Sequence, residues 1–177
     1  MGRGEKSPLP LKEESTMELK DSGKRREFKT GAVRDICEGK GRCDLLPLDV
    51  VGNLEKDPLL VGINEYIRSG DKFKLVQVIT CFSDKHFGNL PTAMLEVSKH
   101  YEDGCNKYGE RNWEKGISLH CYIDSAVRHY LKFKRGDTDE PHDRAFLWNL
   151  LCALWTQDHH PDLCDLPFGK DGNDHAE

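Results

Sequence analysis

The spacing of apolar residues along the chain predicts a series of amphipathic helices. Asp57-Pro58 is a favourable N-cap and first-turn pair, and the apolar residues that follow at helical spacing predict a helix ending at Gly70. The next run, KFKLVQVITCF at 72–82, is rich in β-branched residues and could form a strand by propensity. Its helical context favours a second helix.

Three longer helices are expected in the second half of the chain. Apolar residues recur on one helical face over 94–108 and again over 119–133, and a glycine follows each stripe. The last run, HDRAFLWNLLCALW at 142–155, is apolar nearly all round, which indicates a central buried helix. Together these patterns predict an all-α fold, a helical bundle domain with an irregular N-terminal arm and disordered termini.

Composition divides the chain into segments of different character. The first residues are charged and contain almost no aromatic side chains, so their burial cannot offset the entropy cost of ordering them. In the segment that follows, glycines and Pro47 disfavour a long helix, while leucines and valines need a surface to pack on. The predicted organisation is a disordered tail at 1–30, an ordered arm at 31–55, a helical domain at 56–160 and a C-terminal tail at 161–177.

Charge and cysteine content exclude several classes of protein. Lys and Arg number 26 against 31 Asp and Glu, and the net charge of −5 opposes a general attraction to nucleic-acid phosphates. No apolar run approaches the ~20 residues of a membrane span, and the first residues lack the apolar core of a signal peptide. The seven cysteines are odd in number and include no C-x-x-C pair, which favours reduced thiols. We therefore expect a soluble, intracellular protein that binds neither nucleic acid nor membrane.

Acidic residues gather where the last helix is expected to begin. Glu140 and Asp143 are three residues apart and so can share one helical face. This spacing suits Mg²⁺, although acids at a helix N-terminus also complement the helix dipole without any ligand. On the middle helix, Asp124 and Arg128 have the i,i+4 spacing of an ordinary surface ion pair. The candidate metal ligands are Glu102, Asp124, Glu140 and Asp143.

Cations, amides, imidazoles and aromatic rings are also placed where they could meet a phosphorylated ligand. Glycines at 39 and 41 with basic neighbours can bring backbone N–H groups close to a phosphate, although a plain surface loop has the same composition. Trp113 offers a ring for base stacking, with core packing as the alternative. His142 and Asn149 are two turns apart on one face of the helix. They either contact a ligand or are core residues whose hydrogen bonds are made within the protein. The candidate binding residues are Arg34, Lys40, Arg42, Asn112, Trp113, His129, His142 and Asn149.

Three stretches of the chain resemble a known protein family. They are GAVRDICEGKGRCDLLP in the arm, KYGERNWEKG in the turn, and IDSAVRHYLKFKRGDTDEPHDRAFLWNLLCALW in the last two helices. In combination they are similar to the dATP/dGTP diphosphohydrolases of phages and their hosts, and the resemblance covers roughly residues 31–157. It implies an all-α enzyme, akin to the MazG-like nucleotide pyrophosphatases, and makes 56–160 the nucleotide-hydrolase domain with the arm lying over the site.

The resemblance also implies a reaction and a set of roles. A diphosphohydrolase cleaves dATP or dGTP between the α and β phosphates, leaving the monophosphate and pyrophosphate. Mg²⁺, or Mn²⁺, would be held by the four candidate carboxylates, and the catalytic residues would be Glu102, Lys107 and Arg128. Some relatives serve phages that replace adenine with 2-aminoadenine, which fits a phage or prophage origin and a place in the host cytoplasm. Helical nucleotide pyrophosphatases share sites between subunits, so a homo-oligomer is expected.

One departure from the MazG pattern leaves other functions open. That pattern has Glu-x-x-Glu on one helix and Glu-x-x-Asp on another, and only Glu140-x-x-Asp143 is matched here. An alternative is a triphosphohydrolase of the His-Asp type, which would use His129, His142 and Asp143. The alternative from another class is a non-catalytic nucleotide-binding module with the same pocket.

Overall fold

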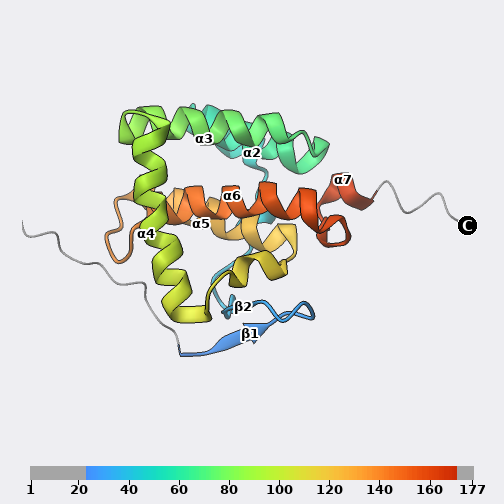
Figure 1. Cartoon of the computed structure of the whole chain (residues 1–177). Coiled ribbons are helices and arrows are strands. Elements are labelled where there is room, and N and C mark those ends of the chain that lie inside the picture. The colour runs from blue at the N-terminus through green and yellow to red at the C-terminus, as the bar shows by residue number, and fades with distance from the viewer. Residues whose placement is uncertain (1–22, 171–177) are drawn as a thin grey trace, which may run out of the picture.

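The computed structural model describes residues 23–170 and consists mainly of α-helices (Figure 1). A short antiparallel hairpin, β1 (Arg25–Glu27) and β2 (Val33–Asp35), precedes the helices. The helices are α1 (Leu48–Glu55), α2 (Pro58–Ser69), α3 (Lys72–Phe87), α4 (Leu90–Tyr108), α5 (Leu119–Arg135), α6 (His142–His159) and α7 (Pro167–Lys170). Short 3₁₀ segments are η1 (Cys43–Leu45), η2 (Asn112–Lys115) and η3 (Pro161–Leu163). This architecture confirms the predicted all-α class.

Side-chain caps define where the helices begin. Asp57 accepts a hydrogen bond from the Leu59 amide at 3.1 Å, and α2 ends at Gly70 as predicted. Asp71 caps α3 in the same way, through the Phe73 amide at 3.0 Å. The β-branched run 72–82 lies within α3, which confirms the predicted helix. Four of its apolar residues share one buried face, which outweighs strand propensity: Leu75, Val78, Ile79 and Phe82.

The helices form two layers that α4 crosses. In Figure 1, α2 and α3 run side by side above α5 and α6, and α4 stands across both pairs. Helix α6 is the central element, with Phe146, Leu147 and Leu150 fully buried, and it packs most extensively on α5. The all-round apolar pattern therefore identified the buried helix. The helix continues to His159, beyond the predicted end near Trp155.

Segments predicted to be a tail or an irregular arm carry regular structure. Residues 25–27 form β1 within the predicted 1–30 tail, and the predicted arm contains α1, whose Leu48 is buried. Beyond residue 160, the chain forms η3 and α7, and the Phe168 ring meets the edge of Tyr66 at 5.7 Å. Residues 1–22 and 171–177 lie outside the described residues. Within the described part, no helix has the length and apolarity needed to cross a membrane.

Candidate functional site

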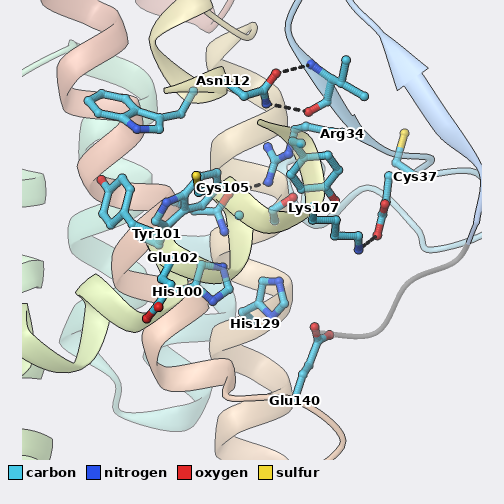
Figure 2. Close-up of a pocket in the computed structure, with 18 of the residues that line it drawn as sticks. Arg34, Cys37, His100, Tyr101, Glu102, Cys105, Lys107, Asn112, His129 and Glu140 are labelled. Carbon is cyan, nitrogen blue, oxygen red and sulfur yellow. Dashed lines mark hydrogen bonds and ion pairs between the residues drawn. The ribbon is translucent and has the colours of Figure 1, made fainter. Parts of the chain in front are cut away.

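A cavity of about 810 Å³ opens between β2, the C-terminal half of α4, the η2 turn, α5 and α6 (Figure 2). Its size lies within the range of small-molecule sites. Most of the predicted binding residues line it. They are Arg34, Lys40, Asn112, Trp113, His129 and Asn149, together with Lys107, Arg128, Glu102 and Glu140.

Arg34 carries a positive charge from the hairpin into this cavity. Its Nη2 donates a hydrogen bond of 2.8 Å to Oδ1 of Asn149, and its Nη1 donates one of 3.3 Å to the Cys121 carbonyl. The guanidinium lies over the rings of Tyr122 and Trp148, at 5.1 and 5.5 Å from their centroids. Both hydrogen-bond acceptors are neutral, and within residues 23–170 no carboxylate forms an ion pair with Arg34. The charge therefore remains available to an anion.

Asn112 fixes the position of β2 at the edge of the cavity. Its Oδ1 accepts from the Val33 amide at 2.9 Å, and its Nδ2 donates to the Val33 carbonyl at 2.8 Å (dashed in Figure 2). The Thr30 hydroxyl adds a 2.7 Å bond to the Gly116 carbonyl. The sequence analysis predicted that the Asn112 amide binds the ligand, whereas in the structure both of its polar atoms are hydrogen-bonded to Val33 of the arm. Its contribution is to hold Arg34 in register.

The other predicted cations differ in how far their charge is neutralised. Lys107 lines the cavity and forms a 2.7 Å ion pair with Asp35. Arg128 also lines it, paired with Asp124 on the same helix, and donates to the Gly41 carbonyl at 3.3 Å. Lys40 lies exposed at the cavity wall. Arg42 is not among the lining residues and forms a two-pronged ion pair with the neighbouring Asp44.

The four predicted metal ligands do not come together. Asp124 is buried outside the cavity, where it accepts from the Cys43 amide at 2.6 Å and pairs with Arg128. Asp143 turns to α3, where its carboxylate lies 2.9 Å from Nε2 of His86. Glu102 is exposed, and Figure 2 places its carboxylate apart from that of Glu140.

Glu140 and Asp143 lie apart because of where α6 begins. Helix α6 begins at His142, so Glu140 belongs to the preceding loop and does not share a helical face with Asp143. The i,i+3 rule applies only inside a helix. Glu140 alone of that pair reaches the cavity.

Two histidines and two acids form a cluster at one end of the cavity. Nδ1 of His129 lies 3.0 Å from Nδ1 of His142, and the other ring nitrogen of His142 lies 2.8 Å from Oδ1 of Asp139. Oε1 of Glu140 lies 3.9 Å from Nδ1 of His142. Lys132 approaches both acids, at 3.4 Å from Asp139 and 3.7 Å from Glu140. Burial, and secondarily the nearby His142 ring, holds the pKa of His129 well below its ordinary value. His142 itself is buried behind the cavity wall.

Several buried polar atoms at the cavity have no protein partner. Across the described chain, buried side-chain nitrogens without a hydrogen bond include Nδ1 of His100, Nε1 of Trp148 and Nε of Arg128, all on residues that line the cavity. Burial, and then the charge of Arg34, lowers the pKa of His100 to about 4, so this imidazole is neutral near pH 7. Buried polar groups are nearly always satisfied, so these atoms indicate a polar ligand.

Sequence reasoning missed several residues of the site. His100 lies one helical turn after the buried Val97, a position that would have placed it on the inner face of α4. Trp148 precedes Asn149 in the apolar run and gave no separate signal. Other lining residues that the sequence did not indicate include Tyr101, Asp35, Lys132 and Asp139.

The fold and the cavity define a helical protein whose cavity has a cationic wall beside aromatic rings and unpartnered polar groups, features suited to an organic anion. A protein-family comparison agrees with this class. The family described as "dATP/dGTP diphosphohydrolase, N-terminal" matches residues 71–165, which is 95 of the 177 residues. The chain belongs to this family.

The match runs from the start of α3 to just after η3. It therefore contains the parts of the cavity that come from α4, η2, α5 and α6, whereas the hairpin with Arg34 lies before it. Neither the curated proteins nor the solved structures gave a match to the chain.

Proposed function

We propose that the protein hydrolyses dATP, dGTP or both to the deoxynucleoside monophosphate and pyrophosphate. The observation that carries this proposal is the guanidinium of Arg34, whose charge enters the cavity without a carboxylate partner. The family supports the class of substrate and the bond that is cleaved. In a phage, the same activity would lower dATP and supply dGMP for 2-aminoadenine nucleotides.

The cationic wall is suited to the triphosphate. Arg34 offers a planar guanidinium that can donate to two phosphate oxygens, while Lys40 can move because it is exposed. Lys107 and Arg128 already pair with carboxylates, so they would act as fixed dipoles at the phosphates more than as full charges. Water oxygen would join the α-phosphorus as the bond to the bridging oxygen breaks and pyrophosphate leaves. These cations would stabilise the charge that develops on the phosphate oxygens.

The polar and aromatic atoms of the cavity are suited to a purine. The neutral His100 and the indole N–H of Trp148 each need a partner, and a purine edge carries both donors and acceptors. Tyr101 and Trp113, whose rings pack edge to face at 5.6 Å, form an apolar wall beside them. A pyrimidine is smaller and would leave at least one of these buried groups unsatisfied, which costs binding energy.

A divalent cation fits one end of the cavity. Mg²⁺ usually binds one or two carboxylates and completes its shell with water and substrate phosphates. Glu140 and Asp139 both line the cavity, and Glu140 is the acid that would hold such an ion, because Asp139 is hydrogen-bonded to Nε2 of His142. When bound, the ion would supply charge neutralisation for the phosphates. Asp124 and Asp143 do not fit this role, because each is committed to another partner outside the cavity.

A second candidate is favoured by the histidine cluster. His142 lies within hydrogen-bond distance of His129 through Nδ1 and of Asp139 through Nε2, which is a more complete His-Asp set than the one expected with Asp143. Such a set would suit cleavage between the deoxyribose oxygen and the α-phosphorus, releasing deoxynucleoside and tripolyphosphate. The family description favours the first reaction.

Self-association is part of the proposal. Leu45, Val50 and Leu54 leave a large apolar surface exposed on η1 and α1. Exposed apolar patches of this kind often mark protein interfaces. The same region adjoins the arm that brings Arg34 to the cavity, so an interface there would stabilise the arm.

A substrate panel tests the proposed function. Purified protein with Mg²⁺ or Mn²⁺ is expected to turn over dATP or dGTP at least about tenfold faster than dCTP and dTTP. Arg34→Met is expected to lower kcat/KM by roughly 100-fold, the effect of removing one strong transition-state donor. Arg68→Met, on the outer surface of α2, is the matched control and should leave it unchanged. Equal turnover of all four nucleotides, or an unaffected Arg34→Met, would contradict the proposal, and binding without turnover would identify a non-catalytic module.

A further inference from the structure

The geometry points to a binding site for one transition-metal dication at the end of the cavity, with Nδ1 of His129, Nδ1 of His142 and a carboxylate oxygen of Glu140 as its ligands. One ligand atom of each of these three residues lies within 4.8 Å of the other two, and Nδ1 of His142 is 3.0 Å from Nδ1 of His129 and 3.9 Å from Oε1 of Glu140. The site stands on this arrangement alone and does not require the proposed hydrolysis.

The imidazole rings of His129 and His142 each present the Nδ1 atom to the other. The Nδ1 atoms are 3.0 Å apart. Two nitrogen ligands about 2.1 Å from one cation and at right angles to each other are also about 3.0 Å apart. The separation of the two nitrogens therefore already matches that of two ligands of one cation, which would replace the proton that otherwise joins them and would need each ring only to turn its Nδ1 lone pair towards it.

Asp139 prepares His142 for this role. Its Oδ1 lies 2.8 Å from Nε2 of His142 and keeps the proton on that nitrogen. The lone pair is then on Nδ1, directed at His129 and Glu140. A carboxylate on the far nitrogen of a metal-binding histidine is the usual outer partner, which fixes the tautomer and the orientation of the ring.

The third ligand and the open side come from the cavity wall. Oε1 of Glu140 lies 3.9 Å from Nδ1 of His142, and both Glu140 and His129 line the cavity. An ion bound there would be reached through the cavity and would keep positions for water or an anionic oxygen. Lys132 contacts Glu140 at 3.7 Å and is partly exposed, so it can turn to solvent as an ion enters.

The donor set selects the kind of metal. Imidazole nitrogen is a good ligand for first-row transition metals, whereas Mg²⁺ prefers oxygen. Two of the three ligands are nitrogens, so we expect Mn²⁺ to bind much more tightly than Mg²⁺. The competing group of Asp137, Asp139 and His142 is less suitable, because Asp137 is paired with Arg135 and Nε2 of His142 already faces Asp139.

Electron paramagnetic resonance of Mn²⁺ added to the full chain, without nucleotide, tests the site. One Mn²⁺ is expected to bind, with electron spin echo modulation from directly coordinated imidazole nitrogen. His129→Gln and Glu140→Gln are expected to weaken binding at least about tenfold, and Asp139→Asn about tenfold through the tautomer of His142. His159→Gln and Glu55→Gln, at the exposed ends of α6 and α1, are the controls and should bind as the wild type does.

The outcomes separate this site from the proposed hydrolysis. Absence of Mn²⁺ binding, Mn²⁺ held by oxygen ligands alone, or equal affinity in wild type and His129→Gln would overturn the site. The nitrogen signal is measured on the wild-type protein, so it decides the question even if a variant at these buried positions fails to fold. Mn²⁺ bound through nitrogen in a protein that hydrolyses no nucleotide would leave the site standing and remove the proposed function.

Discussion

The guanidinium of Arg34 donates a 2.8 Å hydrogen bond to the side-chain oxygen of Asn149, joining the N-terminal hairpin to the most buried helix of the bundle. Asn149 is only 1% exposed, and its Nδ2 is used by the Ala145 carbonyl at 2.8 Å. Its oxygen therefore depends on Arg34 for a donor. This contact joins the arm to α6 and leaves the positive charge of Arg34 without a carboxylate partner.

Replacing Asn149 with Asp is expected to weaken nucleotide binding by neutralising Arg34. Asp has nearly the same shape, and its carboxylate would pair with the guanidinium at the distance now occupied by the amide. The cavity would lose its uncompensated charge, and we expect dGTP affinity to fall at least about tenfold, or ~1.4 kcal/mol. Isothermal titration calorimetry measures the loss. Asn106→Asp, on an exposed position of α4, is the control, and equal affinities for the two variants would show that Arg34 does not bind the phosphates.

Asn112→Ala is expected to release the hairpin without unfolding the bundle. The change removes both hydrogen bonds to Val33, each of which contributes about 0.5–1.5 kcal/mol. Amide hydrogen exchange should accelerate by roughly 10-fold or more over residues 31–37, with α5 and α6 unchanged. Asn106→Ala provides the comparison. Acceleration throughout the helices would mean that Asn112 supports the core instead of the arm.

The pair of His120 and Asp165 is expected to make stability depend on pH. The hydrogen bond that the His120 ring donates to Asp165, and then its hydrogen bond with Cys121, raises the pKa of His120 to about 10. Burial alone would raise the pKa of Asp165, but its bonds with His120 bring it below its ordinary value. The contribution of His120 is therefore full below pH about 6.5 and is lost as the pH rises towards 10, and that of Asp165 is lost in acid below pH about 4.

Asp165→Asn tests this dependence. Asn can still accept the 3.0 Å bond from the His120 amide, so the helix cap is retained while the charge is removed. The melting temperature of the wild type should exceed that of the variant most at pH 5–6 and least near pH 10. Asp162→Asn, in η3, should show no such trend. A difference that stays constant from pH 5 to 10 would mean that the ion pair contributes nothing.

Leu54→Glu is expected to weaken self-association. Leu54 is 78% exposed on α1, one helical turn after the exposed Val50. A buried charge at a subunit interface is strongly unfavourable unless it is paired, so the mass measured by light scattering should shift to that of the monomer. Leu95→Glu is the matched control, because Leu95 is 71% exposed but lies on α4. A wild-type chain that is already monomeric would remove this part of the proposal.

The helices could be predicted because their signals are local. Asp57 and Gly70 bound α2 as expected, and the apolar period of each long segment gave its buried face. The start of α6 was harder to place. The spacing of Glu140 and Asp143 suggested that both lie on one helical face, but the helix begins at His142, and this small shift separated Glu140 from Asp143.

The site could be predicted only in part because its contacts join distant segments. Arg34 and Asn149 were each recognised as polar residues suited to a ligand, but nothing local indicates that they meet across 115 positions. The hairpin gave no apolar signal, since β1 is exposed along its length and is ordered by its pairing with β2 and by the bonds at Asn112 and Thr30. His100 became visible only when the fold showed its ring buried without a partner.

Phosphorus NMR of a dGTP digest tests the central claim most directly. Full-length protein with Mg²⁺ or Mn²⁺ is predicted to produce the signals of dGMP and pyrophosphate in equal amounts, with no tripolyphosphate. The appearance of tripolyphosphate with deoxyguanosine, of dGDP with inorganic phosphate, or of unchanged dGTP would contradict the proposed reaction.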